Sequence, residues 1–176
     1  IMILYIIGII AVRYSKMDIH MPYNLVWIVP QRLLIFDINE QLINNELQLV
    51  DQTINQMLDS AAQTEGKPLA HMITDLSHTV HLPSLGQINK GLTYPKHPQI
   101  GWGMIVGVRQ PMLKMAAGII PQLFKVQARV LDNLEEALNF IQSMDITMPD
   151  LIPFATAAKL GVDVTKLTGK PAAESS

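Results

Sequence analysis

The period of the apolar residues changes repeatedly between residues 23 and 145, and this alternation restricts the fold more than any other feature. Residues 23–39 are rich in β-branched and aromatic side chains and are interrupted at Pro30, which predicts two short strands joined by a tight turn. Residues 44–63 place apolar side chains every three or four positions, as one face of a helix requires. The remaining predicted elements are strands at 69–76, 100–109 and 126–132, a short helix that begins near residue 83, and helices at 111–125 and 133–145. The order β-β-α-β-α-β-α-β-α predicts an α/β domain with a mostly parallel sheet and helices packed on it.

Asparagines mark the predicted starts of two of these helices. Asn45 with Gln48, and Asn133 with Glu136, have the three-residue spacing of a capping box, in which two side chains satisfy free N–H groups at a helix start. Pro121 lies inside the 111–125 pattern. Because proline lacks the N–H that a helix interior uses, it must kink or end that helix.

The composition is that of an ordinary soluble domain. Of 176 residues, 49% are hydrophobic and 16% are charged, and the formal net charge is −2. This balance lacks the basic excess of a nucleic-acid-binding protein, so nucleic acid is not an expected partner. The chain has no cysteine, which excludes disulfides, thiolate zinc sites and cysteine nucleophiles and fits a cytoplasmic protein.

The chain begins with an uninterrupted apolar run over residues 1–12, followed by basic residues. A helix needs roughly 20 apolar residues to span a bilayer, so this run is too short to do so alone. Three interpretations compete: the remnant of a membrane anchor, a signal segment without a small-residue cleavage site, and a mis-assigned start upstream of Met17 or Met21. We favour the last, which places the domain at residues 21–145, and keep membrane association through residues 1–20 as the alternative.

The periodic pattern fades after Asp145. Residues 146–158 are predicted to form a loose apolar arm across the domain, and the polar residues 166–176 to be disordered, so 146–176 is treated as a C-terminal arm and tail. A partly apolar surface together with this arm is compatible with a homodimer.

The stretch from residue 73 to residue 91 concentrates the candidate functional side chains. Asp75 follows a buried strand, at the edge where open α/β sheets bind ligands, but an Asx-turn explains an aspartate there equally well. His78 and His81 make only half of a metal-ligand set, and their place in a loop favours solvated residues over a metal site. Ser84 lies at a helix start, where a phosphate is electrostatically favoured.

Sequence signatures of catalysis are weak. Ser77 and Ser84 have histidines nearby, but the chain has no G-x-S-x-G motif and no glycine-rich phosphate loop followed by a helix. We therefore expect no catalytic residues, no metal and no cofactor.

The element order and several local motifs resemble the STAS family, which includes anti-sigma-factor antagonists and SpoIIAA-like proteins. The resemblance runs from about Tyr23 to Asp145 and rests on the opening hairpin, the strand that ends in Asp75, the HPQIGWGMIVGV strand and the NLEEALNFIQ helix. In anti-sigma-factor antagonists the loop after the third strand reads D-x-S-x-x-x-x-x-D-S-S-G-L. The positions that match are Asp75, Ser77, Ser84 and Gly86. Pro83 stands in place of the second aspartate, and Leu85 replaces the second serine.

This resemblance implies a non-catalytic interaction or regulatory module that binds a protein partner or a small apolar ligand. The residues that it assigns to binding or regulation, with the two histidines of the same loop, are Asp75, Ser77, His78, His81, Ser84 and Gly86. Phosphorylation of Ser84 or Ser77 is a narrower version of the hypothesis. The alternatives are a membrane-tethered sensory or regulatory domain and, less favoured, a metal-dependent enzyme that uses Asp75, His78 and His81.

Overall fold

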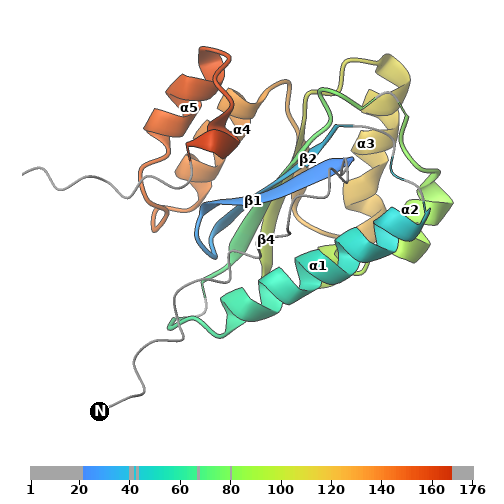
Figure 1. The fold of residues 1–176 in the computed structure, drawn as a ribbon, viewed down its shortest axis with the longest axis horizontal. Coiled ribbons are helices and arrows are strands. Elements are labelled where there is room, and N and C mark those ends of the chain that lie inside the picture. Colours follow the sequence, from blue (N-terminus) through green and yellow to red (C-terminus); the bar gives the residue numbers. More distant parts are fainter. Residues whose placement is uncertain (1–21, 40–41, 43, 67, 80, 168–176) are drawn as a thin grey trace, which may run out of the picture.

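The computed structural model describes residues 22–39, 42, 44–66, 68–79 and 81–167. In chain order the elements are β1 (Tyr23–Val29), β2 (Leu33–Ile38), α1 (Asn44–Ala62), β3 (Ala70–Asp75), α2 (Leu85–Gly91), the 3-10 turn η1 (Tyr94–Lys96), β4 (Ile100–Val106), α3 (Pro111–Phe124), β5 (Ala128–Val130), α4 (Leu134–Met144), α5 (Ile152–Lys159) and the 3-10 turn η2 (Val164–Lys166). Up to α4 this is the predicted order, and the predicted α/β class is confirmed (Figure 1).

The strands form one five-stranded sheet in the order β1-β2-β3-β4-β5. β1 pairs with β2 in the antiparallel sense, and every later pair is parallel. The carboxyl ends of β2, β3, β4 and β5 therefore meet at one edge of the sheet, which we call the carboxyl edge. Their amino ends meet at the opposite, amino edge.

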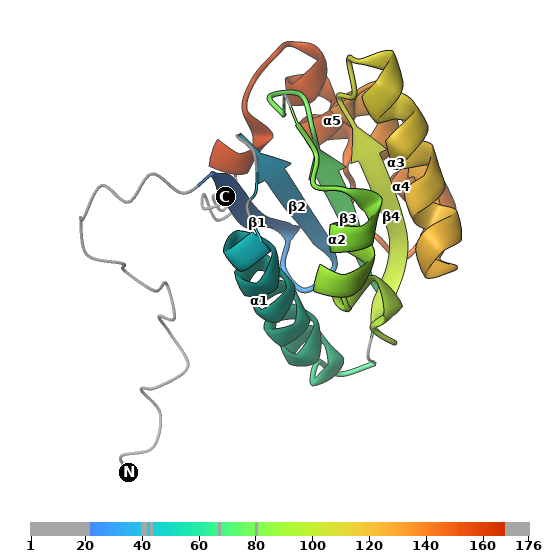
Figure 2. The same ribbon diagram turned by 90° about the vertical axis from the view of Figure 1, so that its right-hand side faces the viewer.

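Helices cover both faces of the sheet. Helices α1, α2 and α3 lie on one face, and α4 and α5 lie on the other (Figures 1 and 2). Successive side chains of β2 point to opposite faces of the sheet. Leu34 and Phe36 pack in the core under α1, whereas Leu33 and Ile35 pack in the core under α4. The sheet is thus buried on both sides, as a parallel sheet must be.

Helix ends differ in part from the predictions. Asn133 caps α4 as predicted, since its Oδ1 accepts the N–H of Glu136 at 2.9 Å. Asn45, however, lies inside α1, which already begins at Asn44. Helix α3 continues past Pro121 and ends three residues later at Phe124, where Lys125 adopts a left-handed conformation with φ 56°.

The C-terminal arm is more regular than predicted. Residues 152–159 form α5, which packs on α4, and η2 contacts β1. Leu151, Ala155 and Val164 are buried in the core under α4, so the arm completes that face of the sheet. The interpretations made for residues 1–20 and for 168–176 lie outside the described residues. None of the helices in the described ranges is long and apolar enough to cross a membrane.

Candidate functional site

A polar cleft of about 700 Å³ opens at the carboxyl edge of the sheet. Its walls come from the ends of β2, β3 and β4, from the start of α4 and from the segment that joins α5 to η2. The polar side chains that line it are Asp37, Asn39, Asp75, Ser77, His78, Arg109, Asp132, Asn133, Asp163 and Thr165. Three of the predicted site residues, Asp75, Ser77 and His78, are therefore brought together here.

Asp75 and Ser77 form the Asx-turn that the sequence offered as one explanation of the aspartate. Oδ1 of Asp75 accepts hydrogen bonds from the backbone N–H of Ser77 at 2.8 Å and from its hydroxyl at 2.6 Å. Gly107, which follows β4, packs directly against this turn with φ 74°. A Cβ on Gly107 would overlap Oγ of Ser77 and come within 2.8 Å of Oδ1 of Asp75, so this wall of the cleft requires glycine.

Asp37 is the one carboxylate of the cleft whose Oδ1 is buried without a hydrogen-bond partner among the described residues. It lies on β2, directly beside Asp75 in the parallel register. Burial raises the pKa of Asp37, and the charges of Asp75 and Asp163 raise it further, whereas His78 acts in the opposite direction. The negative charge of Asp37 is thus unfavourable where it lies, and one of its two oxygens has no hydrogen-bond partner among the described residues.

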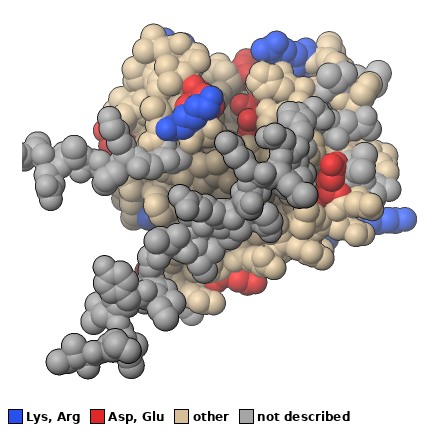
Figure 3. Space-filling model, viewed as in Figure 1, with Lys and Arg blue, Asp and Glu red and all other residues tan. Residues whose placement is uncertain are grey.

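Two other carboxylates of the cleft, Asp132 and Asp163, have hydrogen-bond or ion-pair partners. Asp132 pairs with Lys114 at 2.9 Å, and both side chains are exposed. The hydroxyl of Thr165 donates to Asp163, which lowers the pKa of that carboxyl, and Lys166 lies 3.1 Å from its other oxygen. On the face of the molecule shown in Figure 3, acidic and basic side chains are interspersed.

The loop after β3 separates the predicted site residues into two groups. Thr79 anchors the loop, because its buried hydroxyl donates to the carbonyl of Ile38 at 3.0 Å. Beyond that anchor, Leu82 and Pro83 turn toward the helical layer and do not line the cleft. His81, Ser84 and Gly86 are exposed and do not line the cleft either.

Ser84 is the N-cap of α2. Its Oγ accepts the N–H of Gln87 at 3.3 Å, while the side chain of Gln87 accepts the N–H of Ser84 at 2.8 Å, which completes a capping box. This local role accounts for a serine at position 84. The regulatory role predicted for Ser84 stays a prediction.

The cleft does not present a recognisable nucleophile or metal site. The hydroxyl of Ser77 is directed to Asp75, and no hydrogen bond joins Ser77 to a histidine in the part of the chain that the structure describes. In that same part, no three acidic or histidine side chains are grouped as a metal ion would need. In particular, His81 is not with Asp75 and His78, as the metal-enzyme hypothesis required.

A second cavity, of about 100 Å³ and almost entirely apolar, lies between the sheet and the layer of α1, α2 and α3. Its lining includes Phe36, Ile38, Leu47, Val50, Met72, Leu76, Leu82, Pro83, Ile88, Tyr94, Ile105, Ile120 and Phe124. The same loop that gives Ser77 and His78 to the polar cleft therefore gives Leu76, Leu82 and Pro83 to this apolar cavity.

Buried polar groups fix one end of the apolar cavity. Asp51 of α1 accepts the N–H groups of Thr93 and Tyr94 at 2.6 and 2.9 Å and the hydroxyl of Thr93 at 2.7 Å, and so ties η1 to α1. The Tyr94 side chain hydrogen-bonds to Thr74. Burial, and to a smaller extent Asp51, raises the pKa of Tyr94, which keeps the phenol neutral.

A contrasting polar cluster lies at the amino edge of the sheet. Asp145 accepts hydrogen bonds from Arg32 at 2.6 Å, from His71 at 3.1 Å, and from the N–H and hydroxyl of Thr147 at 2.9 and 2.7 Å. Burial alone would raise the pKa of Asp145, but the hydrogen bonds from Thr147, His71 and Arg32 outweigh it and lower that pKa. Nδ1 of His71 accepts the N–H of Trp102 at 3.0 Å, so the Asp145 side of the ring carries the proton.

Sequence reasoning missed Asp51 as a buried polar residue and Asp37 and Asp145 as half-buried ones. Asp37 and Asp51 each interrupt an apolar pattern, the first in the strand LLIFDI and the second on the buried face of α1. That interruption was the available signal. The pairing of Asp145 with Arg32 joins residues 113 positions apart and has no local signal.

Comparisons with known proteins return structural similarity alone. No family model matches the chain, and no curated protein is significantly similar to it in sequence. Among solved structures, the chain is similar to the anti-sigma factor antagonist SpoIIAA in its unphosphorylated form, with 12% identity, a TM-score of 0.47, and coverage of 68% of this chain and 97% of SpoIIAA. It is also similar to an uncharacterised protein of the DUF3478 family with a SpoIIAA-like fold from Shewanella loihica, with 16% identity, a TM-score of 0.46, and coverage of 67% and 90%. Both matches are to SpoIIAA-like folds, as the sequence resemblance implied, and they concern the fold and not the function.

Proposed function

We propose that this chain is a non-catalytic binding module whose ligand is a small apolar molecule held between the sheet and helices α1, α2 and α3. The observation that carries the proposal is the apolar cavity of about 100 Å³ at that place. Ligand sites in proteins are concave and mostly apolar, with a few placed polar groups, and here Thr74 and Tyr94 are those groups.

The energetic argument follows from the volume of the cavity. Empty space sealed in a core costs about 24 cal/mol per Å³, so this partly open cavity of about 100 Å³ costs less than the roughly 2 kcal/mol of a sealed void of that volume. Apolar cavities of similar size stay dry and bind molecules such as benzene or xenon. A bound apolar molecule would recover the packing that the empty cavity lacks.

The wall formed by α2 is the natural entrance. Helix α2 has seven residues, of which Ile88 alone is buried, so few apolar contacts hold it in place. Segments with few buried contacts open at low free-energy cost. Displacement of α2, with Leu82 and Pro83 on its N-terminal side, would widen the opening of the cavity.

Filling the cavity from within tests the proposal. Val50 is fully buried in the lining, whereas its neighbour Leu49 is 48% exposed on the outer face of α1, so Val50→Phe and Leu49→Phe form a matched pair. In wild type we expect xenon or benzene to shift the methyl NMR signals of Ile88 and Ile105. Leu49→Phe should keep these shifts and Val50→Phe should abolish them. The milder variant Val50→Ile should weaken them if Val50→Phe does not fold.

Either of two results would overturn this function. One is a wild-type protein whose cavity methyl signals do not respond to either probe. The other is equal binding by the Val50→Phe variant. Organic extraction of the purified chain, followed by mass spectrometry, should also find an apolar molecule with wild type and not with Val50→Phe.

A second candidate function, recognition of a protein partner at the polar cleft, is favoured by Asp37. Its buried Oδ1 lacks a partner within the described residues, and Asp75 and Asp163 add to the negative charge around it. A cationic side chain of a partner would pair that carboxylate. Titration with N-acetyl-arginine amide should shift the NMR signals of Gly107 and Asp75 in wild type and not in Asp37→Asn. An unchanged response in Asp37→Asn would remove this candidate.

A further inference from the structure

The charges of this chain are segregated along the sequence. Between Asp75 and Asp132 the chain contains no Asp or Glu, although fifteen such residues occur elsewhere. The basic residues of that same stretch are Lys90, Lys96, Arg109, Lys114, Lys125 and Arg129. The small net charge of −2 therefore conceals a basic segment inside an otherwise acidic chain.

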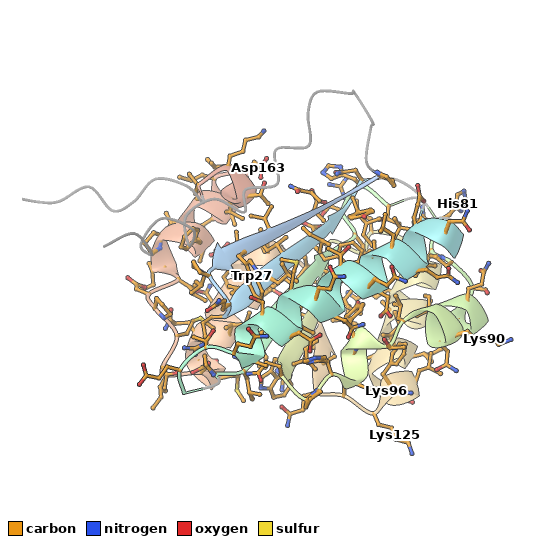
Figure 4. All side chains as sticks on the ribbon, turned by 60° about the horizontal axis from the view of Figure 1, so that its bottom comes forward. Trp27, His81, Lys90, Lys96, Lys125 and Asp163 are labelled. Carbon is orange, nitrogen blue, oxygen red and sulfur yellow. The ribbon has the colours of Figure 1, made fainter. Side chains whose placement is uncertain are left out.

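The fold gathers part of this basic segment on one side of the molecule. Lys90 lies in the last turn of α2, Lys96 ends η1 and Lys125 follows α3, and all three side chains are exposed. Figure 4 shows the three lysines on the side where α2, η1 and the end of α3 meet. Nζ of Lys96 lies 5.8 Å from the ring of Phe124, next to Lys125 in the chain. We call these three residues the lysine face.

The lysine face is not neutralised by its neighbours. Within the described ranges, no carboxylate forms a salt bridge with Lys90, Lys96 or Lys125. The lysines outside this face behave differently: Lys159 and Lys166 pair with acidic side chains at 3.3 and 3.1 Å. A group of unpaired lysines creates a local positive potential that attracts an anionic surface.

Exposed apolar side chains lie on the same helix. Met115 is 74% and Ile119 is 42% exposed, and they are one turn apart on the outer side of α3, the helix that leads into Lys125. Met115 and Ile119 lie about 15 and 9 Å from Lys125 along α3. Lysines and exposed apolar side chains on one surface are the combination that binds a lipid interface, where the charges meet headgroups and the apolar groups enter the acyl boundary. Nucleic acid would use the charges and would gain little from Met115 and Ile119, and an acidic protein is separated from a lipid surface by the test below.

We propose that the lysine face docks on an anionic lipid surface. The charge complementarity described above carries this proposal, and it does not depend on whether the apolar cavity holds a ligand. The acidic remainder of the chain would be repelled by such a surface, so the protein would bind with α2, η1 and the end of α3 toward the lipid.

The affinity of the lysine face for an anionic lipid surface should depend on the number of its lysines. Each lysine near an anionic leaflet contributes about 1 kcal/mol, which corresponds to roughly five-fold in affinity. Replacing two lysines of the face should therefore weaken binding about 25-fold, and replacing all three about 100-fold. Since the attraction is electrostatic, it should also weaken steeply between low and physiological salt.

The test is sedimentation of the full chain with vesicles of phosphatidylcholine alone or of a mixture of phosphatidylcholine and anionic phosphatidylserine. The neutral vesicles give the baseline for any binding through the apolar residues 1–12. Lys90→Gln/Lys125→Gln is compared with Lys159→Gln/Lys166→Gln, which makes the same change of charge away from the face. We expect the anionic vesicles to bind wild type and the control pair equally, and the Lys90/Lys125 pair about 25-fold more weakly.

The outcomes separate the possible partners. Equal binding of wild type to neutral and anionic vesicles would overturn the proposal, as would equal losses in the two double variants. Binding to RNA or to an acidic protein without binding to anionic vesicles would also overturn it. In a further arm, the uncharged variant Met115→Gln should reduce vesicle binding while heparin binding is unchanged. A loss of both in Met115→Gln would point to a structural defect and contradict the apolar contact.

Discussion

Asp37 and Asp145 are two half-buried carboxylates at opposite edges of the same sheet, and they differ in their hydrogen bonds and in the charges beside them. Asp145, at the amino edge, accepts hydrogen bonds from Arg32, His71 and Thr147, and these lower its pKa. Asp37, at the carboxyl edge, has a buried oxygen without a partner in the described chain, and burial together with Asp75 raises its pKa.

The difference indicates which edge stabilises the protein and which is available for binding. A carboxylate whose hydrogen bonds are all satisfied contributes to the fold, and its removal leaves other buried groups unpaired. A carboxylate kept unpaired beside like charges weakens the fold. Such residues cluster at functional sites, because binding or chemistry is what compensates for their cost.

The rigidity of the carboxyl edge can be tested at Gly107. Gly107→Ala should lower the free energy of unfolding by about 3 kcal/mol, because the new Cβ meets Ser77 and Asp75 at a positive φ. Gly118→Ala is the matched control, since nothing lies within 4 Å of its Cβ position in α3, and it should stabilise the fold by about 0.5–1 kcal/mol. Urea unfolding followed by circular dichroism measures both. A decrease of less than about 1 kcal/mol in the free energy of unfolding of Gly107→Ala would mean that the wall of the cleft is flexible enough to accommodate the new Cβ.

The stabilising role of the amino edge can be tested at Asp145. Asp145→Ala leaves Arg32, His71 and Thr147 without their acceptor and should cost about 2–3 kcal/mol. Asp59→Ala is the control, because its side chain is 70% exposed and pairs with His97 at the surface. It should change stability by less than about 0.5 kcal/mol. Equal effects of the two variants would remove the contrast between buried and surface carboxylates.

Local pattern was sufficient to predict most of the fold. The strands and helices up to α4 follow from period, turn residues and caps, because each element buries one face against its neighbours. Helix α5 was not predicted, since it has only eight residues and owes its burial to Leu151 and Ala155 packing on α4. Packing of this kind is decided by tertiary contacts and not by local propensity.

The candidate site was predicted less well, for reasons that are also tertiary. The sequence indicated one surface from Asp75 to Gly86. However, the hydroxyl of Thr79 is hydrogen-bonded to the end of β2, so the residues before Thr79 line the polar cleft and Leu82 and Pro83 after it line the apolar cavity. Asp37 joins Asp75 only through the register of β2 on β3. The acid-free segment between Asp75 and Asp132 was visible in the sequence, yet a net charge summed over the whole chain conceals it.

As the pH falls, His71 at the amino edge should lower the free energy of unfolding, whereas Asp37 at the carboxyl edge should raise it. Burial lowers the pKa of His71, and Arg32 lowers it further although Asp145 opposes this. A group with a lowered folded pKa contributes stability that is present above its unfolded pKa of about 6.5 and is lost as the pH falls toward the folded value. The free energy of unfolding should therefore fall from pH 7 to pH 5, by at most about 1.4 kcal/mol per pH unit from this residue.

His71→Gln should flatten that part of the profile, whereas the exposed His81→Gln should leave it as in wild type. Urea unfolding at half-unit intervals of pH measures the slope. A wild-type slope in His71→Gln would show that other groups cause the loss of stability in acid.

Among these variants, Asp37→Asn should make the smallest change in the free energy of unfolding, and its dependence on pH should be opposite in sign to that of His71. A raised folded pKa in a carboxyl group means that its contribution is most favourable below the unfolded pKa of about 3.8 and is lost as the pH rises through the folded value. At pH 7 the neutral amide removes the repulsion from Asp75 and should stabilise the fold by about 0.5–1 kcal/mol, with allowance for solvent screening. The gain should shrink as the pH falls through the raised pKa of Asp37, where the wild-type carboxylate becomes protonated. Destabilisation by Asp37→Asn at pH 7 would mean that this carboxylate supports the fold, and the contrast with Asp145 would then fail.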